Sequence, residues 1–245
     1  MIREHAVVVG GTRGLGLVIV ERFLARGFAV TVLSRRPCEK HRENPLVRHV
    51  AVDLEKLSDF DEVDGDYLSG RPIRYLAFAQ RFRGQGDPWQ GEIQVGLTAT
   101  RVLIEGLVDR FAETGDRAIA AVSSVYAEFV GGSQPVGYHV VKAGLNAMTR
   151  YYAWSLGGRG IRMNAVMPLT YIKDESRAFY QSQGAINDLY RRLVPLQRMG
   201  EAGDNADVVD FLCSERAAFI TGQSLFVDGG VSIVWPEETA SKFSA

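Results

Sequence analysis

Short apolar runs alternate with longer amphipathic segments along this chain, and that alternation constrains the fold more than any other feature. Seven runs rich in valine, isoleucine and alanine are candidate strands, and segments with apolar residues at helical spacing lie between most of them. Strands that read as continuous apolar runs are typical of parallel sheets covered by helices on both faces. The sequence therefore predicts an α/β fold, with a doubly wound, mostly parallel seven-stranded sheet and helices on both of its faces.

The expected elements can be placed on the sequence from this pattern. Strands are predicted at 6–9, 28–33, 47–52, 74–79, 118–122, 161–166 and 224–227, and helices at 14–26, 91–113, 137–156 and 203–213. No internal repeat or change in composition divides the chain, which indicates a single domain over residues 1–245. The least regular segment, 169–200, mixes aromatic, charged and glycine residues, and we expect it to form a substrate loop with one or two short helices.

The composition argues against several classes of protein. With 46% apolar residues and a formal net charge of -1, the chain is typical of an ordinary soluble globular protein without a nucleic-acid partner. No apolar run reaches transmembrane length, and the first strand begins so close to Met1 that no cleavable leader and no membrane partner are expected. Cys38 and Cys213 lie far apart without a metal-ligand spacing, so we predict no disulfide, no metal site and a cytoplasmic location.

A glycine-rich turn follows the first candidate strand and leads into the first helix. It reads Gly10-Gly11-Thr12-Arg13-Gly14-Leu15-Gly16. Glycines at such a turn let the backbone bend tightly and approach a pyrophosphate, while free N–H groups and the dipole of the helix N-terminus attract its negative charge. A glycine-rich turn without a ligand is the alternative. The position between a strand and a helix favours a Rossmann-type dinucleotide site.

Tyr138 and Lys142 are four residues apart and therefore lie on the same face of the expected helix 137–156. A phenol acts as an acid or base near neutral pH only if its pKa falls by roughly 3, which corresponds to about 4 kcal/mol. An ammonium group at about 4 Å supplies an attraction of that size at an effective dielectric constant of ~20. The pair is therefore a candidate proton-transfer unit, with a buried structural tyrosine as the alternative.

Ser123 and Ser124 end the run 118–122, at the edge of the expected sheet where open α/β proteins bind ligands. Three motifs together resemble the single-domain branch of the short-chain dehydrogenase/reductase superfamily, in particular its 3-oxoacyl reductase and ketoreductase members: Gly10-x-x-x-Gly14-x-Gly16, Ser124 and Tyr138-x-x-x-Lys142. The segments 195–200 and 220–230 are similar to the family's C-terminal part, so the resemblance covers about residues 5–232.

The resemblance implies an activity and a set of site residues. It implies hydride transfer between a nicotinamide and a carbonyl or alcohol substrate, in which Ser124 holds the carbonyl, Tyr138 transfers the proton and Lys142 binds the nicotinamide ribose. Gln94 stands for the helix asparagine that completes the family's catalytic set. Cofactor contacts are implied for residues of the glycine turn and of the strand ends: Gly10, Thr12, Arg13, Gly14, Leu15, Gly16, Ser34, Arg35, Arg36, Asp53, Leu54, Ala79, Gln80, Tyr138, Lys142 and Pro168.

The chain departs from the family pattern near the site. Residues 77–80 read Ala-Phe-Ala-Gln where the family usually has Asn-Asn-Ala-Gly, Gln94 replaces an asparagine, and Leu169 replaces a glycine. These changes leave open a non-catalytic dinucleotide sensor as one alternative. A second alternative, independent of them, is an epimerase or dehydratase that uses the same site. Retention of the serine, the tyrosine and the lysine favours the oxidoreductase.

The cofactor is predicted to be NADP(H). The second expected strand ends in Leu33-Ser34-Arg35-Arg36, without the acidic residue that would bind the ribose 2′-hydroxyl of NAD. Ser34, the two arginines and Arg13 suit a 2′-phosphate instead, because guanidinium groups form strong charge-assisted hydrogen bonds with phosphate. Solvated surface arginines are the alternative.

Arg81 and Arg83 follow the fourth expected strand, at the same edge of the sheet. Their planar donor groups suit a carboxylate or phosphate, so the small-molecule substrate is expected to be acidic or strongly polar. Contact with the cofactor pyrophosphate, or with solvent, is the alternative. An aromatic and basic lid is expected to close over the ligand, formed by Tyr171, Lys173, Arg177, Phe179 and Tyr180. The resemblance also implies a homo-oligomer, a tetramer or a dimer, that assembles through helices 91–113 and 137–156.

Overall fold

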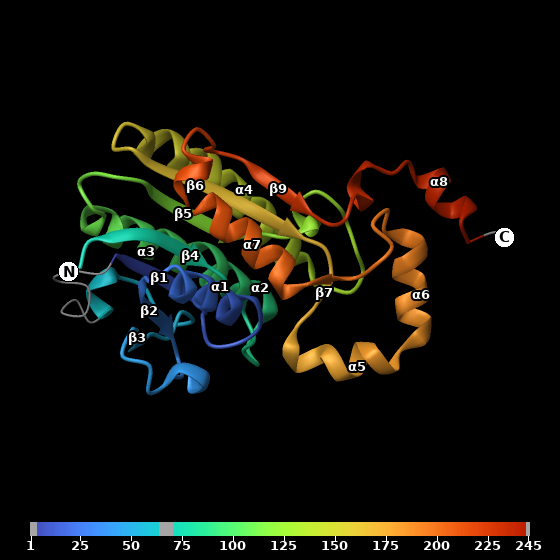
Figure 1. Cartoon of the computed structure of the whole chain (residues 1–245), viewed down its shortest axis with the longest axis horizontal. Helices are drawn as coiled ribbons and strands as arrows, with labels where there is room; N and C mark the ends of the chain where they lie inside the picture. Colours follow the sequence, from blue (N-terminus) through green and yellow to red (C-terminus); the bar gives the residue numbers. More distant parts are fainter. Residues whose placement is uncertain (1–3, 64–70, 244–245) are drawn as a thin grey trace.

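In the computed structural model, which describes residues 4–63 and 71–243, seven strands form one parallel sheet (Figure 1). The spatial order is β3-β2-β1-β4-β5-β6-β9, so the order reverses between β1 and β4. This is the doubly wound sheet that the sequence predicts, and its strand boundaries lie within two residues of the expected ones. The strands are β1 (His5–Val9), β2 (Ala29–Ser34), β3 (Val47–Ala51), β4 (Ile73–Phe78), β5 (Arg117–Val122), β6 (Ile161–Pro168) and β9 (Ser224–Val227).

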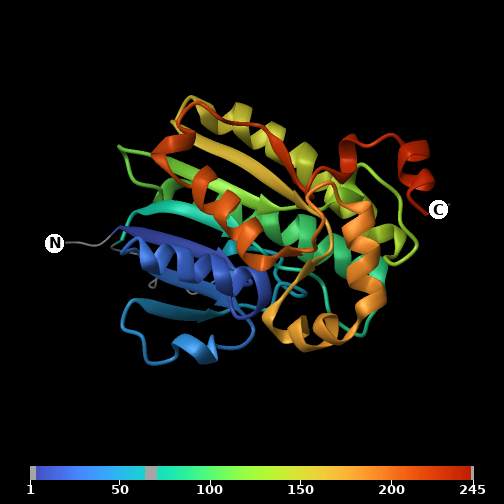
Figure 2. The same ribbon diagram turned by 45° about the vertical axis from the view of Figure 1, so that its right-hand side comes forward.

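Helices cover both faces of this sheet (Figures 1 and 2). One face carries α1 and α7 over a buried cluster that includes Val8 and Phe23, and the other carries α2, α3 and α4 over a cluster that includes Val7 and Leu103. The side chains of neighbouring residues in β1 thus enter opposite cores, as the pleat requires. The predicted fold class is confirmed. The helices are α1 (Gly14–Ala25), α2 (Pro88–Ile93), α3 (Ala99–Leu107), α4 (Val136–Gly157) and α7 (Ala202–Leu212).

The expected helix 91–113 is an interrupted run. It begins at Pro88, because the Asp87 side chain accepts a hydrogen bond from the Trp89 backbone N–H (3.0 Å) and proline suits the first helical position. A π-helical turn, Gln94–Thr98, joins α2 to α3, and a 3₁₀ turn ends the run at Arg110. The predicted start was three residues late because the Asp-Pro cap signal was not used. Single π-helical turns often mark functional sites.

The segment 169–200 contains the expected short helices, α5 (Arg177–Ser182) and α6 (Gly184–Leu193), which extend to one side of the sheet (Figure 2). Its two ends are joined by a small parallel sheet of β7 (Tyr171–Ile172) and β8 (Gly200–Glu201), which the sequence did not predict. A further unexpected helix, α8 (Pro236–Ser241), follows the last strand. No helix in the described parts of the chain has both the length and the apolar character needed to cross a membrane.

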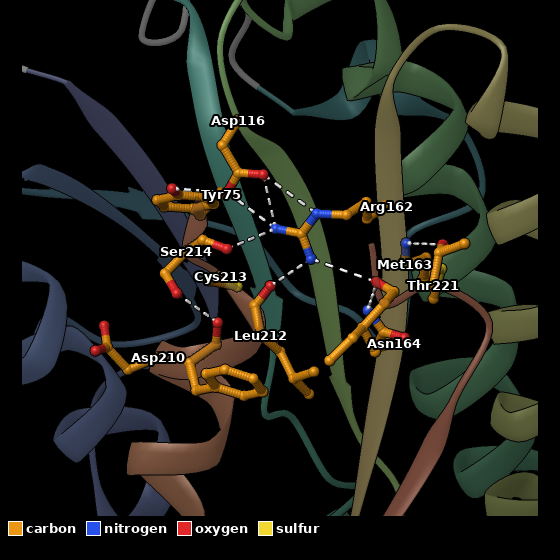
Figure 3. Close-up of polar contacts among 12 residues, drawn as sticks. Tyr75, Asp116, Arg162, Met163, Asn164, Asp210, Leu212, Cys213, Ser214 and Thr221 are labelled. Carbon is orange, nitrogen blue, oxygen red and sulfur yellow. Dashed lines mark hydrogen bonds and ion pairs between the residues drawn. The ribbon is translucent and has the colours of Figure 1, made fainter. Parts of the chain in front are cut away.

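A buried ion pair fixes the amino ends of the central strands (Figure 3). Arg162, the second residue of β6, pairs with Asp116 just before β5 at 2.9 Å, and its guanidinium also donates to the backbone oxygens of Leu212 (2.8 Å) and Ser214 (3.1 Å). Tyr75 on β4 donates to the same carboxylate at 3.0 Å. This network therefore ties three strands to the end of α7, at the edge of the sheet opposite the candidate site.

Candidate active site

The glycine turn between β1 and α1 leaves room for a ligand because its backbone packs closely. Gly10 has a φ of +80°, and a Cβ on this residue would lie 2.9 Å from the Cα of Gln80. A Cβ on Gly16 would lie 2.2 Å from the carbonyl oxygen of Gly10. The first turn of α1 has no side-chain cap and no acidic residue, so its N–H groups stay available to an anion. The geometry of the turn is compatible with a pyrophosphate, and binding of one there stays a prediction.

Four cationic side chains, contributed by three segments, lie around this turn: Arg13, Arg81, Arg83 and Lys173. Burial lowers the pKa of Arg83 and of Lys173, and repulsion from the neighbouring cations lowers both further. Glu175 is the acidic group among them, and its Oε1 lies 3.2 Å from the position of a Cβ on Gly14. A cluster with this excess of positive charge is suited to a polyphosphate.

Ser124 and Tyr138 meet at the carboxyl end of β5. Ser124 is buried, and its hydroxyl accepts a hydrogen bond from the Tyr126 backbone N–H (3.2 Å). Burial raises the pKa of Tyr138, whereas hydrogen bonding with Ser124 and the charge of Arg81 lower it. The Arg81 guanidinium lies 4.8 Å from the centre of the Tyr138 ring, and the Lys142 ammonium lies 5.4 Å from it. The predicted serine, tyrosine and lysine are thus brought together.

Lys142 is a buried cation with few hydrogen-bond partners. It is 5% exposed, and its ammonium donates to the backbone oxygen of Val122 at 2.8 Å, while Ser123 donates to the Lys142 backbone oxygen at 3.0 Å. Burial lowers its pKa to about 8, Glu92 opposes that change, and Arg81 adds to it. Ser124 and Arg81 lower the pKa of Tyr138 against the effect of burial, and the expected lowering by Lys142 stays a prediction.

Glu92 is a site residue that sequence reasoning missed. It lies on α2 and is 5% exposed. Burial raises the pKa of its carboxyl group, and the positive charges of Arg81 and Lys142 lower it. A signal was available, because a glutamate three residues before a buried valine falls on the inner side of an amphipathic helix.

The two glutamines point away from the Tyr138–Lys142 pair. The Gln94 amide donates to the backbone oxygens of Leu57 (2.7 Å) and Leu54 (3.2 Å), so its side chain anchors the segment that follows β3. Gln80 donates to the Thr100 hydroxyl at 2.8 Å. The Gln94 side chain is therefore engaged away from Tyr138 and Lys142. Its backbone lies at the start of the π-helical turn and is the part of Gln94 left to serve the site.

The residues predicted to recognise the cofactor ribose lie at the end of β2. Ser34 donates to the Arg36 backbone oxygen (2.7 Å), and Arg35 pairs with Glu55 at 2.7 Å with about half of its side chain exposed. Arg13 and Arg36 are exposed at this same edge. The Asp53 carboxylate accepts from the Glu55 backbone N–H (3.2 Å). The remaining expected contacts also lie at the carboxyl edge: Ala79 directly after β4, Thr12 in the turn before α1, Leu15 in the first turn of α1, and Pro168 at the end of β6.

The expected lid is only partly at the site. Tyr171 interacts electrostatically with Tyr138, and burial raises its pKa to about 12. Lys173 reaches the glycine turn, where its Cδ lies 3.4 Å from a Cβ built on Gly14. In contrast, Arg177 pairs with Asp174 and Glu201, and Phe179 is exposed on α5, where it contacts the ring of Tyr180.

A model of the enoyl-(acyl carrier protein) reductase family matches residues 78–232. The 3-oxoacyl-[acyl-carrier-protein] reductase FabG of Aquifex aeolicus is 28% identical over 242 residues, which cover 92% of this chain and 96% of that protein. The L-rhamnose 1-dehydrogenase (NAD(P)(+)) of Azotobacter vinelandii is 37% identical over 147 residues, which cover 58% of this chain and 55% of that protein.

Solved structures share the fold. The TT0495 protein from Thermus thermophilus has a TM-score of 0.80 and 27% identity, with 96% of this chain and 100% of that chain covered. A gluconate 5-dehydrogenase from Burkholderia cenocepacia, in complex with NADP and tartrate, has a TM-score of 0.81 and 21% identity, with 96% and 97% covered. The family match over more than half of the sequence, together with this sheet, shows that the chain belongs to the short-chain dehydrogenase/reductase family of oxidoreductases, which act on CH–OH and C=O groups.

Proposed function

We propose that this protein is an NADP(H)-dependent oxidoreductase that interconverts a carbonyl and an alcohol, with Tyr138 as the acid or base. The observation that carries the proposal is the position of Ser124, Tyr138 and Lys142 beside a glycine turn that fits a pyrophosphate. Retention of this site favours an oxidoreductase over a sensor that has lost its chemistry. An epimerase or dehydratase that uses the same site is the remaining alternative.

The chain's own residues have separate tasks in this reaction. The bound nicotinamide supplies or accepts the hydride. Ser124 donates a hydrogen bond to the substrate oxygen, and Tyr138 gives its proton to that oxygen as the carbonyl is reduced, or takes it back in the reverse direction. Lys142 holds a positive charge next to the phenol and has two ammonium protons left for ribose hydroxyls, since one is bonded to Val122.

Tyr138→Phe tests the chemistry. Turnover should be abolished while the dissociation constant for NADPH stays nearly unchanged, because the change removes one hydroxyl and keeps the ring. Tyr126→Phe is the matched control, since Tyr126 contacts the Tyr138 ring edge-on and bonds to Ser133. If Tyr138→Phe keeps a tenth of the wild-type rate, tyrosine is not the proton donor. Ketones, quinones, acyl thioesters and keto-sugars, assayed by nicotinamide absorbance, would separate an oxidoreductase from a sensor.

The preference for NADP(H) rests on the charges at the end of β2. Arg35 and Arg36 supply two positive charges there, Arg13 lies in the neighbouring glycine turn, and Ser34 stands where an acidic residue would exclude a 2′-phosphate. Arg35→Ala should weaken NADPH binding roughly 10- to 100-fold. Arg42→Ala, which removes an exposed arginine paired with Glu39, is the control. Equal dissociation constants for NADH and NADPH in the wild type would contradict the preference.

Arg81 supports an acidic or strongly polar substrate. Its guanidinium lies over the Tyr138 ring and donates a hydrogen bond to the Gln134 side chain, so its charge lies next to the phenol. The gluconate 5-dehydrogenase and the 3-oxoacyl reductase among the similar proteins are named for acidic or carrier-bound substrates. We therefore place carboxylated keto-sugars and 3-oxoacyl thioesters first in the substrate panel.

An exposed aromatic face on α4 supports a homo-oligomer. Tyr151 is 60% exposed and Trp154 is 80% exposed, one turn apart on the same helix. Large exposed apolar side chains that cluster mark interaction surfaces. Light scattering that finds a monomer at micromolar concentration would contradict this proposal. The single domain over residues 1–245, with 169–200 as its substrate segment, and the cytoplasmic location stay predictions.

A further inference from the structure

His139, the residue after Tyr138 on the first turn of α4, contacts the loop that leads into this helix through both of its ring nitrogens. Its Nε2 accepts a hydrogen bond from the Gly131 backbone N–H at 3.2 Å, and its Nδ1 lies 3.1 Å from the Pro135 backbone oxygen. The proposed mechanism uses neither nitrogen. Both partners belong to the loop of residues 129–135, which connects the turn after Ser124 to α4.

These two hydrogen bonds require the same tautomer of the imidazole. A backbone oxygen only accepts, so the proton lies on Nδ1, whereas a backbone N–H only donates, so Nε2 carries no proton. An imidazolium would turn a second N–H toward the Gly131 N–H and lose that bond. The structure therefore assigns His139 a neutral ring whose acceptor faces the loop.

The Tyr126 ring fixes the plane of this imidazole. The two rings stack with their centroids 5.0 Å apart and an angle of 28° between their planes. A Cβ on Gly131 would lie 2.5 Å from a carbon of the Tyr126 ring, so only glycine lets the loop backbone come this close. The Tyr126 hydroxyl also bonds to Ser133 at 3.0 Å, but this bond is exposed and water replaces it at little cost.

The middle of the 129–135 loop has little apolar packing to hold it. Val130 is 95% exposed, and a Cβ on Gly132 would have no atom of the described residues within 4 Å. The hydrogen bond from Gly131 to His139 is partly buried, in contrast to the bond between Tyr126 and Ser133. The order of this stretch therefore depends strongly on the Nε2 acceptor.

The end of the loop reaches the phenol of Tyr138 through Arg81. Gln134 accepts a hydrogen bond from the Arg81 guanidinium, which lies 4.8 Å from the centre of the Tyr138 ring. The Tyr126 ring meets the Tyr138 ring edge-on, with 6.2 Å between the centroids. One layer of side chains thus separates the loop from the phenol, and the position of the loop helps to orient Arg81.

We propose that His139 is a positioning residue, whose neutral ring with its proton on Nδ1 holds the 129–135 loop against the site and keeps Arg81 in place for an acidic substrate. The role in substrate binding rests on the proposed function, whereas the hold on the loop does not. Without the Nε2 acceptor the loop should open more often, which lowers the fraction of protein that is competent to bind substrate. The groups of the chemical step stay in place, so KM should rise while kcat stays nearly constant.

The tautomer can be measured on the cofactor-free protein. The chain has four histidines, and ¹⁵N labelling of their rings distinguishes a nitrogen that carries a proton from a bare one, at a pH at which the rings are neutral. The His139 signals are assigned by their loss in His139→Gln and should show the proton on Nδ1. His49 is the internal contrast, because its Nε2 donates to the Ser34 backbone oxygen at 2.9 Å and must carry the proton.

Two substitutions separate the hydrogen bond from the packing of the ring. His139→Phe keeps a ring against Tyr126 and removes the acceptor, whereas His139→Gln removes the ring and keeps an acceptor within reach of Gly131. Amide hydrogen exchange in residues 129–135 should be about 2- to 10-fold faster in His139→Phe and close to the wild-type rate in His139→Gln. His49→Gln, which changes a ring on β3, is the control and should leave exchange in this loop unchanged.

Initial-rate kinetics test the role in substrate binding. The probe is whichever carboxylated keto-sugar or 3-oxoacyl thioester the wild type reduces. Its KM should be about 2- to 10-fold higher in His139→Phe, with kcat changed by less than about 2-fold, and His139→Gln should restore most of the wild-type KM.

The outcomes are distinct. A proton on Nε2 of His139, or loop exchange in His139→Phe as slow as in the wild type, overturns the hold on the loop, whatever the protein catalyses. Fast exchange in His139→Gln also overturns it, because the ring and not the hydrogen bond would then order the loop. If His139→Phe does not fold, the tautomer in the wild type decides.

Failure of the proposed function would look different. If the tautomer and the exchange rates are as expected but the wild type reduces no carbonyl compound, the hold on the loop stands and the proposed function fails. If the wild type does reduce one and its KM is unchanged in His139→Phe, the role of His139 in substrate binding is wrong.

Discussion

Two buried cations lie at opposite edges of the same sheet, and they are stabilised very differently. Arg162, at the amino edge, has all three guanidinium nitrogens engaged, by the Asp116 carboxylate and by backbone oxygens near the end of α7 (Figure 3). Lys142, at the carboxyl edge, is as deeply buried and has one hydrogen bond, to Val122.

The difference separates a structural ion from a functional one. A buried charge contributes to stability only when its donors are satisfied and an opposite charge lies in contact with it, and Arg162 meets both conditions. Lys142 meets neither condition, and its pKa is lowered to about 8 because burial disfavours its charge. Its free donors point to a ligand that completes the site, at the expense of the stability of the ligand-free protein. Methionine substitutions at the two positions should therefore have opposite effects.

Arg162→Met should have the largest effect on folding. It leaves Asp116 buried with Tyr75 as a remaining partner and removes the donor to the Leu212 and Ser214 oxygens, so the free energy of unfolding should fall by about 3–5 kcal/mol. Urea denaturation measures this change. Arg159→Met, which breaks an exposed ion pair with Asp109, should cost less than about 1 kcal/mol. If Arg162→Met lowers the free energy of unfolding no more than Arg159→Met does, the structural role of Arg162 is wrong.

Lys142→Met should stabilise the protein at pH 7 and abolish turnover. The ordinary lysine pKa is 10.5, and a folded-state value of about 8 means that the charged form is disfavoured by folding. Removing that charge should raise the free energy of unfolding by on the order of 2–3 kcal/mol. Denaturation at pH 7 measures it. A destabilised variant would indicate that Lys142 is better satisfied than its single hydrogen bond suggests.

The pH dependence of the free energy of unfolding should reveal the titration of Lys142. Between about pH 8 and pH 10.5 the folded protein has lost the Lys142 proton while the unfolded chain still holds it, so stability rises with pH in this window. Below pH 8 both states are protonated and the cost is constant. The difference in unfolding free energy between Lys142→Met and the wild type should therefore shrink from pH 8 upward and vanish near pH 10.5. A constant difference over this range would contradict the assignment.

The same contrast explains what sequence could predict. Apolar strand patterns predict the seven-stranded parallel sheet, and the positions of glycine, serine, tyrosine and lysine predict which residues lie at its carboxyl edge, because both depend on local periodicity and on where each strand ends. The Arg162–Asp116 pair was not predictable, because its partners are 46 residues apart and meet only through sheet register. Glu92 had a local signal, its spacing to the buried Val95, but its charged neighbours Arg81 and Lys142 come from other elements and could not be predicted from α2 alone. The lid was predicted from composition, which cannot separate Lys173 at the glycine turn from Arg177 paired elsewhere.

The smallest effect concerns the two arginines after β4, which the sequence assigned jointly to the substrate. Both arginines belong to the cation cluster around the glycine turn, but they differ in their further contacts, since Arg81 also lies over the Tyr138 ring, whereas Arg83 interacts with Arg13 and Glu175. Burial and the neighbouring cations lower the pKa of Arg83, so an anion bound there would relieve its repulsion from Arg13.

Arg83→Met should therefore weaken NADPH binding about 10-fold, or ~1.4 kcal/mol, and leave the KM of the substrate nearly unchanged, because the lost contact is with phosphate. Arg81→Met should do the reverse and raise KM, because its lost contact is with the substrate. Fluorescence titration with NADPH and initial-rate kinetics on the same two variants measure both quantities. If both variants raise KM and spare NADPH, the two arginines share one anionic substrate, as the sequence alone suggests. If both weaken NADPH and spare KM, neither binds the substrate, and the case for an acidic substrate is lost while the carbonyl chemistry at Tyr138 is untouched.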